Sequence, residues 1–171
     1  MTPTQLECIE QQLGRPPRGL AEIAYQSPDG IPMVLRMHSL VDDKPFPTLY
    51  WLCSTDLDRA ISRIESTGWI KQIEQELQLD TEFKERYLQN HRDYVATRAQ
   101  YLSPELRQRI AELGFSEVLE RYGIGGISQW DRVRCLHMQY AHYLCTEGDN
   151  RNVIGARMEQ EFSLSQLKIT R

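Results

Sequence analysis

The pattern of hydrophobic and polar positions divides the chain into a strand-rich first third and a helical remainder. Apolar residues recur at helical spacing from Pro3, and Gly14 is suited to end this first helix. Short alternating or aromatic runs separated by turn residues then predict antiparallel strands. These strands are expected near residues 20–25, 31–38 and 48–53, with a loop at 40–47.

Helical periodicity dominates the rest of the sequence. We predict a helix capped by Thr55 and ending at Gly68, and a short helix that begins after Ser103. Further helices are expected over 69–79, 81–101, about 130–146 and 153–162, with one helical turn and a glycine loop in 114–128. A sheet of about three strands needs a cover. The sequence therefore predicts one α+β domain over residues 1–171, in which several helices cover a small antiparallel sheet.

Composition narrows the class of protein. Hydrophobic residues make up 40% of the chain and charged residues 26%, with a net charge of −4 and no concentration of basic residues. This balance is typical of a globular protein and gives no electrostatic footprint for nucleic acid. No apolar run approaches the roughly 18 residues of a membrane span, and the first residues lack a secretory core. We therefore expect a cytoplasmic protein, without a nucleic-acid or membrane partner, whose four cysteines are reduced.

The segment 131–145 carries the strongest chemical signal. On a continuous helix, Cys135, Gln139 and His142 would share one line at i, i+4 and i+7, on a helix that is otherwise almost entirely apolar. His137 would fall beside the apolar stripe. If the helix is rotated from this placement, His137 and His142 exchange roles.

Cys53 supplies a third candidate ligand. It ends a predicted strand just before a helix, where the helix N-terminus can lower the pKa of a thiol. Cys53, Cys135 and His142 would together suit zinc or another thiophilic metal, with His137 or Glu65 as a fourth ligand. Three ligands would leave a coordination position open, as in a metalloenzyme. The metal-free alternative is a thiol enzyme with Cys53 as nucleophile, His142 as base and Cys135 as resolving thiol.

Two weaker patterns accompany this site. In GRPPRG, Arg15 and Arg18 lie on a proline-stiffened turn and could hold a phosphate or carboxylate, or simply pair with acidic neighbours. The glycine loop 122–128 follows a helix and does not match G-x-G-x-x-G or a P-loop. It is interpreted as a tight turn, so no nucleotide cofactor is expected.

The order of these motifs resembles a known bacterial family. GRPPRG, PFPTLYWLC, SRIE, GIGGI, VRCLHMQYAHYL and NVIG follow one another over about residues 15–155, and together they are similar to domain of unknown function 501. The resemblance marks Cys53, Cys135, His137, His142, Arg15 and Arg18 as motif positions without implying an activity. The resemblance also implies a gene context, because actinobacterial relatives are often encoded beside an exopolyphosphatase and a septum-formation protein. From this gene context, the resemblance implies an alternative function: a non-catalytic interaction module in cell division or polyphosphate metabolism, with an unknown protein partner.

Overall fold

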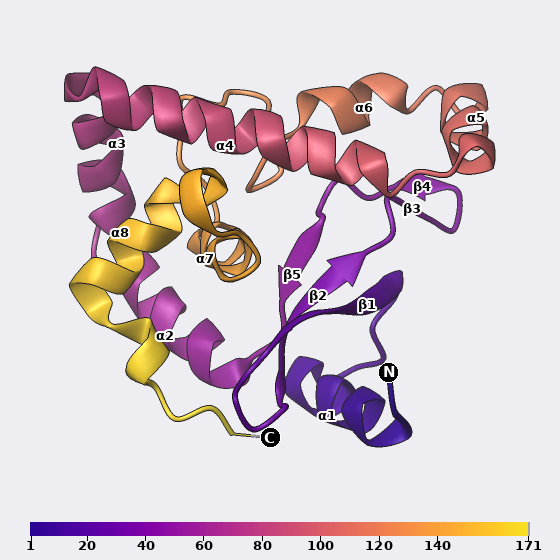
Figure 1. Ribbon diagram of the computed structural model, residues 1–171, viewed down its shortest axis with the longest axis horizontal. Coiled ribbons are helices and arrows are strands. Elements are labelled where there is room, and N and C mark those ends of the chain that lie inside the picture. The colour runs from indigo at the N-terminus through magenta and orange to yellow at the C-terminus, as the bar shows by residue number, and fades with distance from the viewer. Residues whose placement is uncertain (171) are drawn as a thin grey trace.

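A three-stranded antiparallel sheet in the first third of the chain supports the helices around it (Figure 1). The computed structural model describes residues 1–170. Strand β2 is central, because Leu35 pairs with Ile23 of β1 on one side and with Trp51 of β5 on the other. The predicted α+β class is confirmed. The strands of the sheet are β1 (Leu20–Gln26), β2 (Pro32–Met37) and β5 (Tyr50–Leu52).

The segment predicted as a loop between β2 and β5 contains a small hairpin. Strands β3 (Leu40–Val41) and β4 (Lys44–Pro45) pair through Val41 and Lys44. The two intervening residues, Asp42 and Asp43, have φ values of 51° and 55°. A two-residue turn with both φ values positive matches the right-handed twist of the flanking strands, and aspartate tolerates this conformation better than most residues.

Eight α-helices occupy much of residues 1–170, and most begin where the sequence predicts. Two differ. The cap of the second helix is Ser54, whose side chain accepts a hydrogen bond from the Leu57 N–H, and that helix ends before Gly68. The helix predicted over about 130–146 is much shorter. The helices are α1 (Pro3–Leu13), α2 (Thr55–Glu65), α3 (Trp69–Leu79), α4 (Thr81–Gln100), α5 (Pro104–Glu112), α6 (Ser116–Arg121), α7 (Leu136–Leu144) and α8 (Val153–Phe162).

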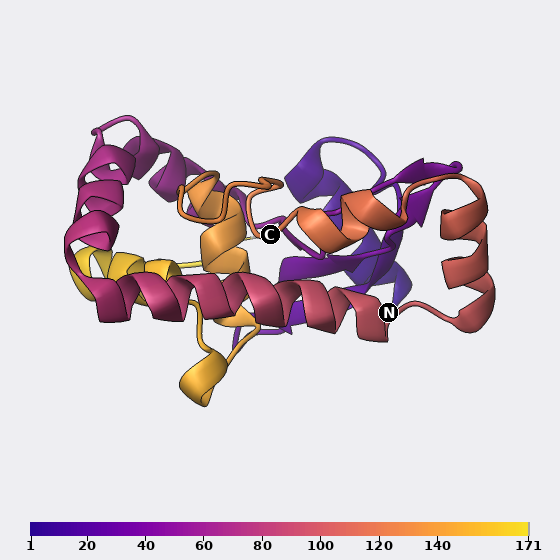
Figure 2. The ribbon, with the colours of Figure 1, turned by 90° about the horizontal axis from the view of Figure 1, so that it is seen from above.

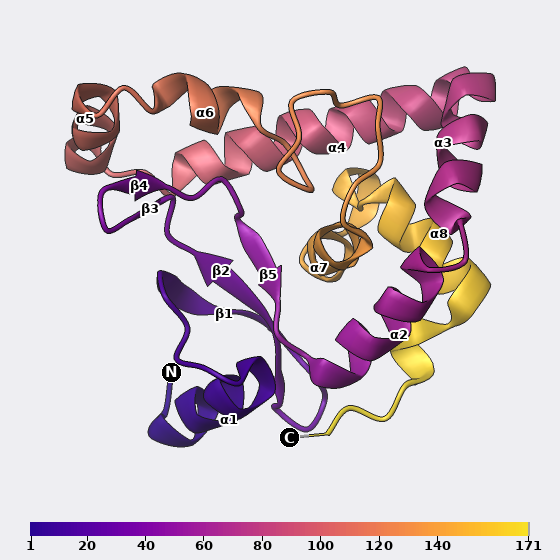
Figure 3. The ribbon, with the colours of Figure 1, turned by 180° about the vertical axis from the view of Figure 1, so that it is seen from behind.

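The two faces of the sheet belong to different hydrophobic clusters. Successive side chains of a strand point to opposite faces. Tyr50 and Leu52 of β5 accordingly join the larger cluster with α7, whereas Trp51 and Cys53 pack with Leu35 in the smaller one. Helix α1 contacts β2 on the side of the smaller cluster, and α7 lies across the sheet from it (Figures 1 and 3).

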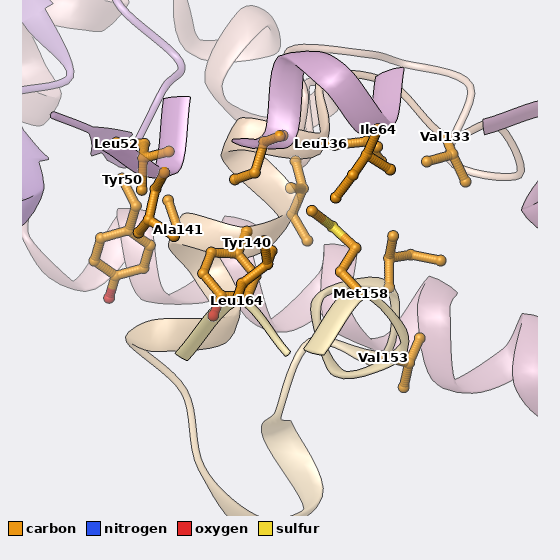
Figure 4. Close-up of a cluster of buried hydrophobic side chains, with 14 of the residues drawn as sticks. Tyr50, Leu52, Ile64, Val133, Leu136, Tyr140, Ala141, Val153, Met158 and Leu164 are labelled. Carbon is orange, nitrogen blue, oxygen red and sulfur yellow. The ribbon is translucent and has the colours of Figure 1, made fainter. Parts of the chain in front are cut away.

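Helix α7 lies at the centre of the larger cluster. It contacts β5, α2 and α8. Figure 4 shows Tyr50 and Leu52 beside Ala141, and Ile64 beside Leu136. The packing fixes α7 from three directions, so the groups at its two ends are held in defined places.

The long helix α4 packs on the larger cluster, on the side of the sheet where α7 lies, and it runs along the length of the molecule (Figure 2). The guanidinium group of Arg98, a residue of α4, is almost fully buried and donates hydrogen bonds to the carbonyls of Pro47 and Tyr122. A buried charge requires such hydrogen-bond partners. Through them, Arg98 joins the segment before β5 to the end of α6. Within residues 1–170, none of the helices combines the length and the apolar character needed to cross a bilayer.

Candidate functional site

The start of α7 is held by side chains from distant helices. The Val133 N–H donates to Oε1 of Glu74 over 2.9 Å, and the Arg132 carbonyl accepts a hydrogen bond from the Tyr87 hydroxyl. These contacts replace the intrahelical bonds that a longer helix would make. The prediction of a helix from about residue 130 is therefore wrong, and α7 begins only at Leu136.

Cys135 immediately precedes α7 in an unusual backbone conformation. Its φ and ψ are 53° and 80°, in the left-handed region that non-glycine residues rarely adopt. The following N–H, that of Leu136, donates to Oε1 of Glu65 over 2.7 Å. Because Cys135 lies outside the helix, the predicted i, i+7 alignment with His142 does not exist.

Three potential ligands converge at this end of α7. One ligand atom each from Glu65, Cys135 and His137 lies within 4.8 Å of the other two, and all three residues are partly buried. Nδ1 of His137 is 3.4 Å from Oε1 of Glu65. Within residues 1–170 these are the His, Cys, Asp and Glu residues that gather closely enough to share an ion. The structure thus places Cys135 beside both His137 and Glu65, the two residues predicted from the sequence as a fourth ligand.

The opposite edge of the His137 ring is held by α2. Nε2 lies 3.2 Å from the Asp58 carbonyl, 3.3 Å from its Oδ1 and 3.3 Å from Oγ of Ser62. Asp58, Ser62 and Glu65 are spaced i, i+4 and i+7, so one face of α2 presents all three. Burial lowers the pKa of His137, but the hydrogen bond with Cys135 and the charge of Glu65 outweigh it and raise the pKa to about 9.

His142 lies at the other end of α7 and has a different environment. It is 2% exposed, its ring stacks on Tyr50, and its Nδ1 accepts a hydrogen bond from Nδ2 of Asn152 over 3.1 Å. Burial, and secondarily the nearby His91, lower the pKa of His142 to about 3. It is a neutral core residue and does not join the cluster at Cys135.

Cys53 is also separate from that cluster. It packs with Ile9 and Leu35 on the α1 side of the sheet, whereas α7 packs on the other side. Burial, with a smaller effect from Cys8, raises the pKa of Cys53 to about 12. The predicted site of Cys53, Cys135 and His142 is therefore not assembled, and the expected lowering of the Cys53 pKa is wrong. The alternation of side chains along β5 is the physical reason.

The glycine loop supports the segment that leads to Cys135. A Cβ atom on Gly125 would lie 2.6 Å from the Arg134 carbonyl oxygen, and Gly125 has a φ of 80°. A Cβ atom on Gly123 would lie 2.1 Å from Nδ1 of His91, which accepts a hydrogen bond from the Ile124 N–H. The loop is a tight turn in which Gly125 permits close approach to the chain just before Cys135 and Gly123 permits close approach to His91.

Arg15 and Arg18 lie far from α7 in a different setting. Both line a surface cavity of about 700 Å³ near the end of α1, and Arg18 pairs with Asp42 over 2.8 Å. Sequence reasoning named these two arginines, as well as Glu65, Cys135 and His137. It missed Asp58 and Ser62, although their spacing from Glu65 on a predicted helix was a usable signal.

Comparison with known proteins places the chain in one family. The chain belongs to the family described as "Protein of unknown function (DUF501)", whose model matches residues 23–160. The match confirms the family resemblance that the motifs indicated. The family description assigns no activity to its members. No significant match was found among curated proteins or among solved structures. The matched segment includes Glu65, Cys135 and His137 and begins after Arg15 and Arg18.

Proposed function

We propose that the protein binds one transition-metal ion, with zinc as the first candidate, through Glu65, Cys135 and His137. The observation that carries the proposal is the 3.4 Å separation between Nδ1 of His137 and Oε1 of Glu65, with a third donor residue within 4.8 Å. Two nitrogen or oxygen ligands of one tetrahedral zinc lie about 3.3–3.4 Å apart. Small side-chain shifts would bring the thiolate to a matching position.

The donor set suits zinc chemically. Thiolate, imidazole and carboxylate are its three usual protein ligands, and a single thiolate favours zinc over magnesium or calcium. Oε1 of Glu65 already accepts the Leu136 N–H, but a carboxylate has enough lone pairs to bind an ion as well. The site therefore needs no rebuilding of the backbone.

The support behind His137 strengthens this assignment. A metal-binding histidine usually gives its second ring N–H to a carboxylate or carbonyl, which fixes the ring and its tautomer. Nε2 of His137 has the Asp58 carboxylate, the Asp58 carbonyl and the Ser62 hydroxyl within 3.3 Å. Nδ1 is then the ring atom that faces the proposed ion.

Three protein ligands would leave the fourth position for water or a substrate. Zinc sites with three protein ligands and an open position are typical of enzymes, in which the metal lowers the pKa of the bound water to about 7. The side chains of Glu65 and His137 are 30% and 20% exposed, so solvent can reach the group. We infer that the site is suited to metal-assisted hydrolysis rather than to a closed structural role.

Metal uptake should depend on pH. The ring of His137 has a pKa near 9 without metal, and an imidazole must lose its proton to ligate. Binding therefore releases a proton, and the apparent affinity should rise as the pH increases from 6 to 8.

Cobalt titration of the chelator-treated, untagged protein tests the proposal. We expect one Co²⁺ per chain, a thiolate-to-cobalt absorption band, and displacement by Zn²⁺. Cys135→Ser should remove the band, and His137→Gln should weaken binding by at least about tenfold. The matched controls are Cys145→Ser and His38→Gln, which change a cysteine and a histidine outside the cluster. Unchanged binding by Cys135→Ser, or the absence of stoichiometric binding, contradicts the proposal.

A second candidate function is thiol chemistry without metal. Its supporting observation is that Cys135 lies in a strained conformation at the start of a helix, beside an imidazole positioned to take its proton. Alkylation followed by mass spectrometry distinguishes the candidates. Thiol chemistry predicts that Cys135 reacts faster than Cys53 and Cys145, and that His137→Gln slows only this reaction. Complete protection of Cys135 by one equivalent of Zn²⁺ favours the metal site.

A further inference from the structure

A cavity on the α1 side of the molecule is separate from the proposed metal site. It has a volume of about 700 Å³ and lies between the end of α1, the smaller hydrophobic cluster and the β3–β4 hairpin. Volumes of roughly 300–1,000 Å³ are typical of small-molecule sites. Its lining includes Arg15, Arg18, Val41, Lys44, Phe46 and Trp51.

The floor of the cavity is apolar and fixed. Leu35 is fully buried and Met37 is 5% exposed, and both belong to the smaller hydrophobic cluster. Phe46 and Trp51 stack with their ring centroids 6.0 Å apart. Leu35 and Met37 support the floor from beneath, and the partly exposed side chains of Val41, Phe46 and Trp51 offer the surface that an apolar ligand can cover. Such burial is favourable at about 25 cal/mol per Å².

The rim of the cavity is cationic. Arg15, Arg18 and Lys44 contribute three positive charges, against the single carboxylate of Asp42. The Arg18–Asp42 pair is exposed, with side-chain exposures of 75% and 65%, so it is weak and readily exchanged. Arg15 makes no ion pair with any residue in the described part of the chain. The rim therefore carries a net positive charge that can attract an anion.

Both walls of the cavity are held in place. Oδ1 and Oδ2 of Asp43 pair with the Arg109 guanidinium over 3.2 and 2.6 Å, which anchors the β3–β4 hairpin to α5. On the other wall, the GRPPRG turn carries two prolines and ends at Gly19, where a Cβ atom would lie 2.4 Å from Cγ2 of Val41. Such restriction reduces the entropy lost when a ligand binds.

We propose that this cavity binds an amphipathic organic anion, namely a medium-length alkyl carboxylate. Its chain lies over Val41 and the Phe46–Trp51 pair, and its carboxylate is held by Arg15 and Arg18. Guanidinium groups suit this head group because their planar N–H donors match a carboxylate in a bidentate way. The apolar floor below a cationic rim excludes a small hydrophilic anion, which would leave the floor wet.

Isothermal titration with decanoate, below its micelle concentration, tests the proposal on the full chain. We expect one saturable site for decanoate, and at least about tenfold weaker binding of decanol and of decyltrimethylammonium, which lack the negative charge. In ¹⁵N spectra the indole signal of Trp51 should move, while those of Trp69 and Trp130 should not. No saturable binding, equal binding of decanol, or movement of all three signals overturns the proposal.

Paired arginine variants locate the head group. The double variant Arg15→Gln/Arg18→Gln changes exposed residues, so the fold should persist, and decanoate binding should weaken by about tenfold or more. Arg59→Gln/Arg63→Gln removes the same charge from exposed positions of α2 and should leave binding unchanged. Equal weakening by both double variants would show a general charge effect and reject the assigned contacts. Neither pair touches Glu65, Cys135 or His137, so failure here leaves the metal proposal standing.

Discussion

The two ends of α7 each carry a histidine, but the fold uses the two rings differently. At the C-terminal end, the ring of His142 is enclosed by Tyr50 and Tyr94 and accepts a hydrogen bond from Asn152. At the N-terminal end, His137 is 20% exposed and faces a thiol and two carboxylates. The difference shows that residue type alone does not identify a site. The two ends of α7 differ in how many of their polar atoms already have hydrogen-bond partners within the folded core.

The buried end forms a continuous network of amide and imidazole groups. Asn152 donates to Oε1 of Gln139 and to Nδ1 of His142, and its Oδ1 accepts the Gly155 N–H at the start of α8. Gln139 in turn donates to the Tyr87 hydroxyl over 2.9 Å. Each group satisfies another, as burial in a low-dielectric interior requires. This end therefore contributes to stability, and its imidazole is not available for chemistry.

The largest expected effect follows from breaking this network. Asn152→Ala removes the α8 cap and leaves Gln139 and His142 without their partner, so we expect a loss of about 2–4 kcal/mol in the free energy of unfolding. Urea denaturation measures it. Cys135→Ser at the other end, in metal-free protein, should cost less than about 1 kcal/mol. A larger loss from Cys135→Ser than from Asn152→Ala would invert the comparison between the ends.

The pH dependence of stability should show the same contrast at a smaller scale. His142 has a folded pKa near 3, well below the ordinary value, so the unfolded chain binds more protons between pH 3 and 6.5. The stability that depends on the neutral His142 ring is therefore fully present above about pH 6.5 and is lost as the pH falls, by roughly 1 kcal/mol per pH unit from this residue. His91, whose pKa burial also lowers to about 3, adds a similar loss.

The variant His142→Asn isolates the contribution of one ring. It keeps an acceptor near the position of Nδ1 but removes the titrating group, so the slope of unfolding free energy against pH between 6.5 and 5 should become shallower. His38→Asn, which changes an exposed histidine outside the network, is the matched control. An unchanged slope in His142→Asn would show that the ring binds its proton as readily in the folded protein as in the unfolded chain, so that burial does not lower its pKa.

Local sequence patterns predicted the fold more reliably than they predicted the site. The three strands and the helices α1, α3, α4 and α8 follow from periodicity and capping residues, which act within a few positions of the chain. The β3–β4 hairpin was missed because its turn uses two aspartates instead of Asn-Gly.

The site depended on contacts that no local pattern carries. Residues 130–135 have helical periodicity, yet Glu74 and Tyr87 satisfy backbone groups there from other helices, and Glu65 does so at Leu136, where α7 begins. The shortened helix places His137 beside Cys135. The strand alternation that turns Cys53 away was readable in advance, because Trp51 and Cys53 share the face opposite to Tyr50 and Leu52.

The smallest expected effect concerns the backbone of Cys135. With a φ of 53°, a residue with a Cβ atom costs about 1–2 kcal/mol relative to its preferred conformation, whereas glycine adopts this region freely. Cys135→Gly and Cys135→Ala both remove the thiol, and only the alanine variant retains the strain. We therefore expect Cys135→Gly to be more stable than Cys135→Ala by about 0.5–1 kcal/mol in thermal unfolding without metal. Equal stability would mean that the left-handed conformation relaxes once the thiol is gone. A clear difference means that the chain carries a strained cysteine where glycine would be more stable, which fits a residue retained for its sulfur.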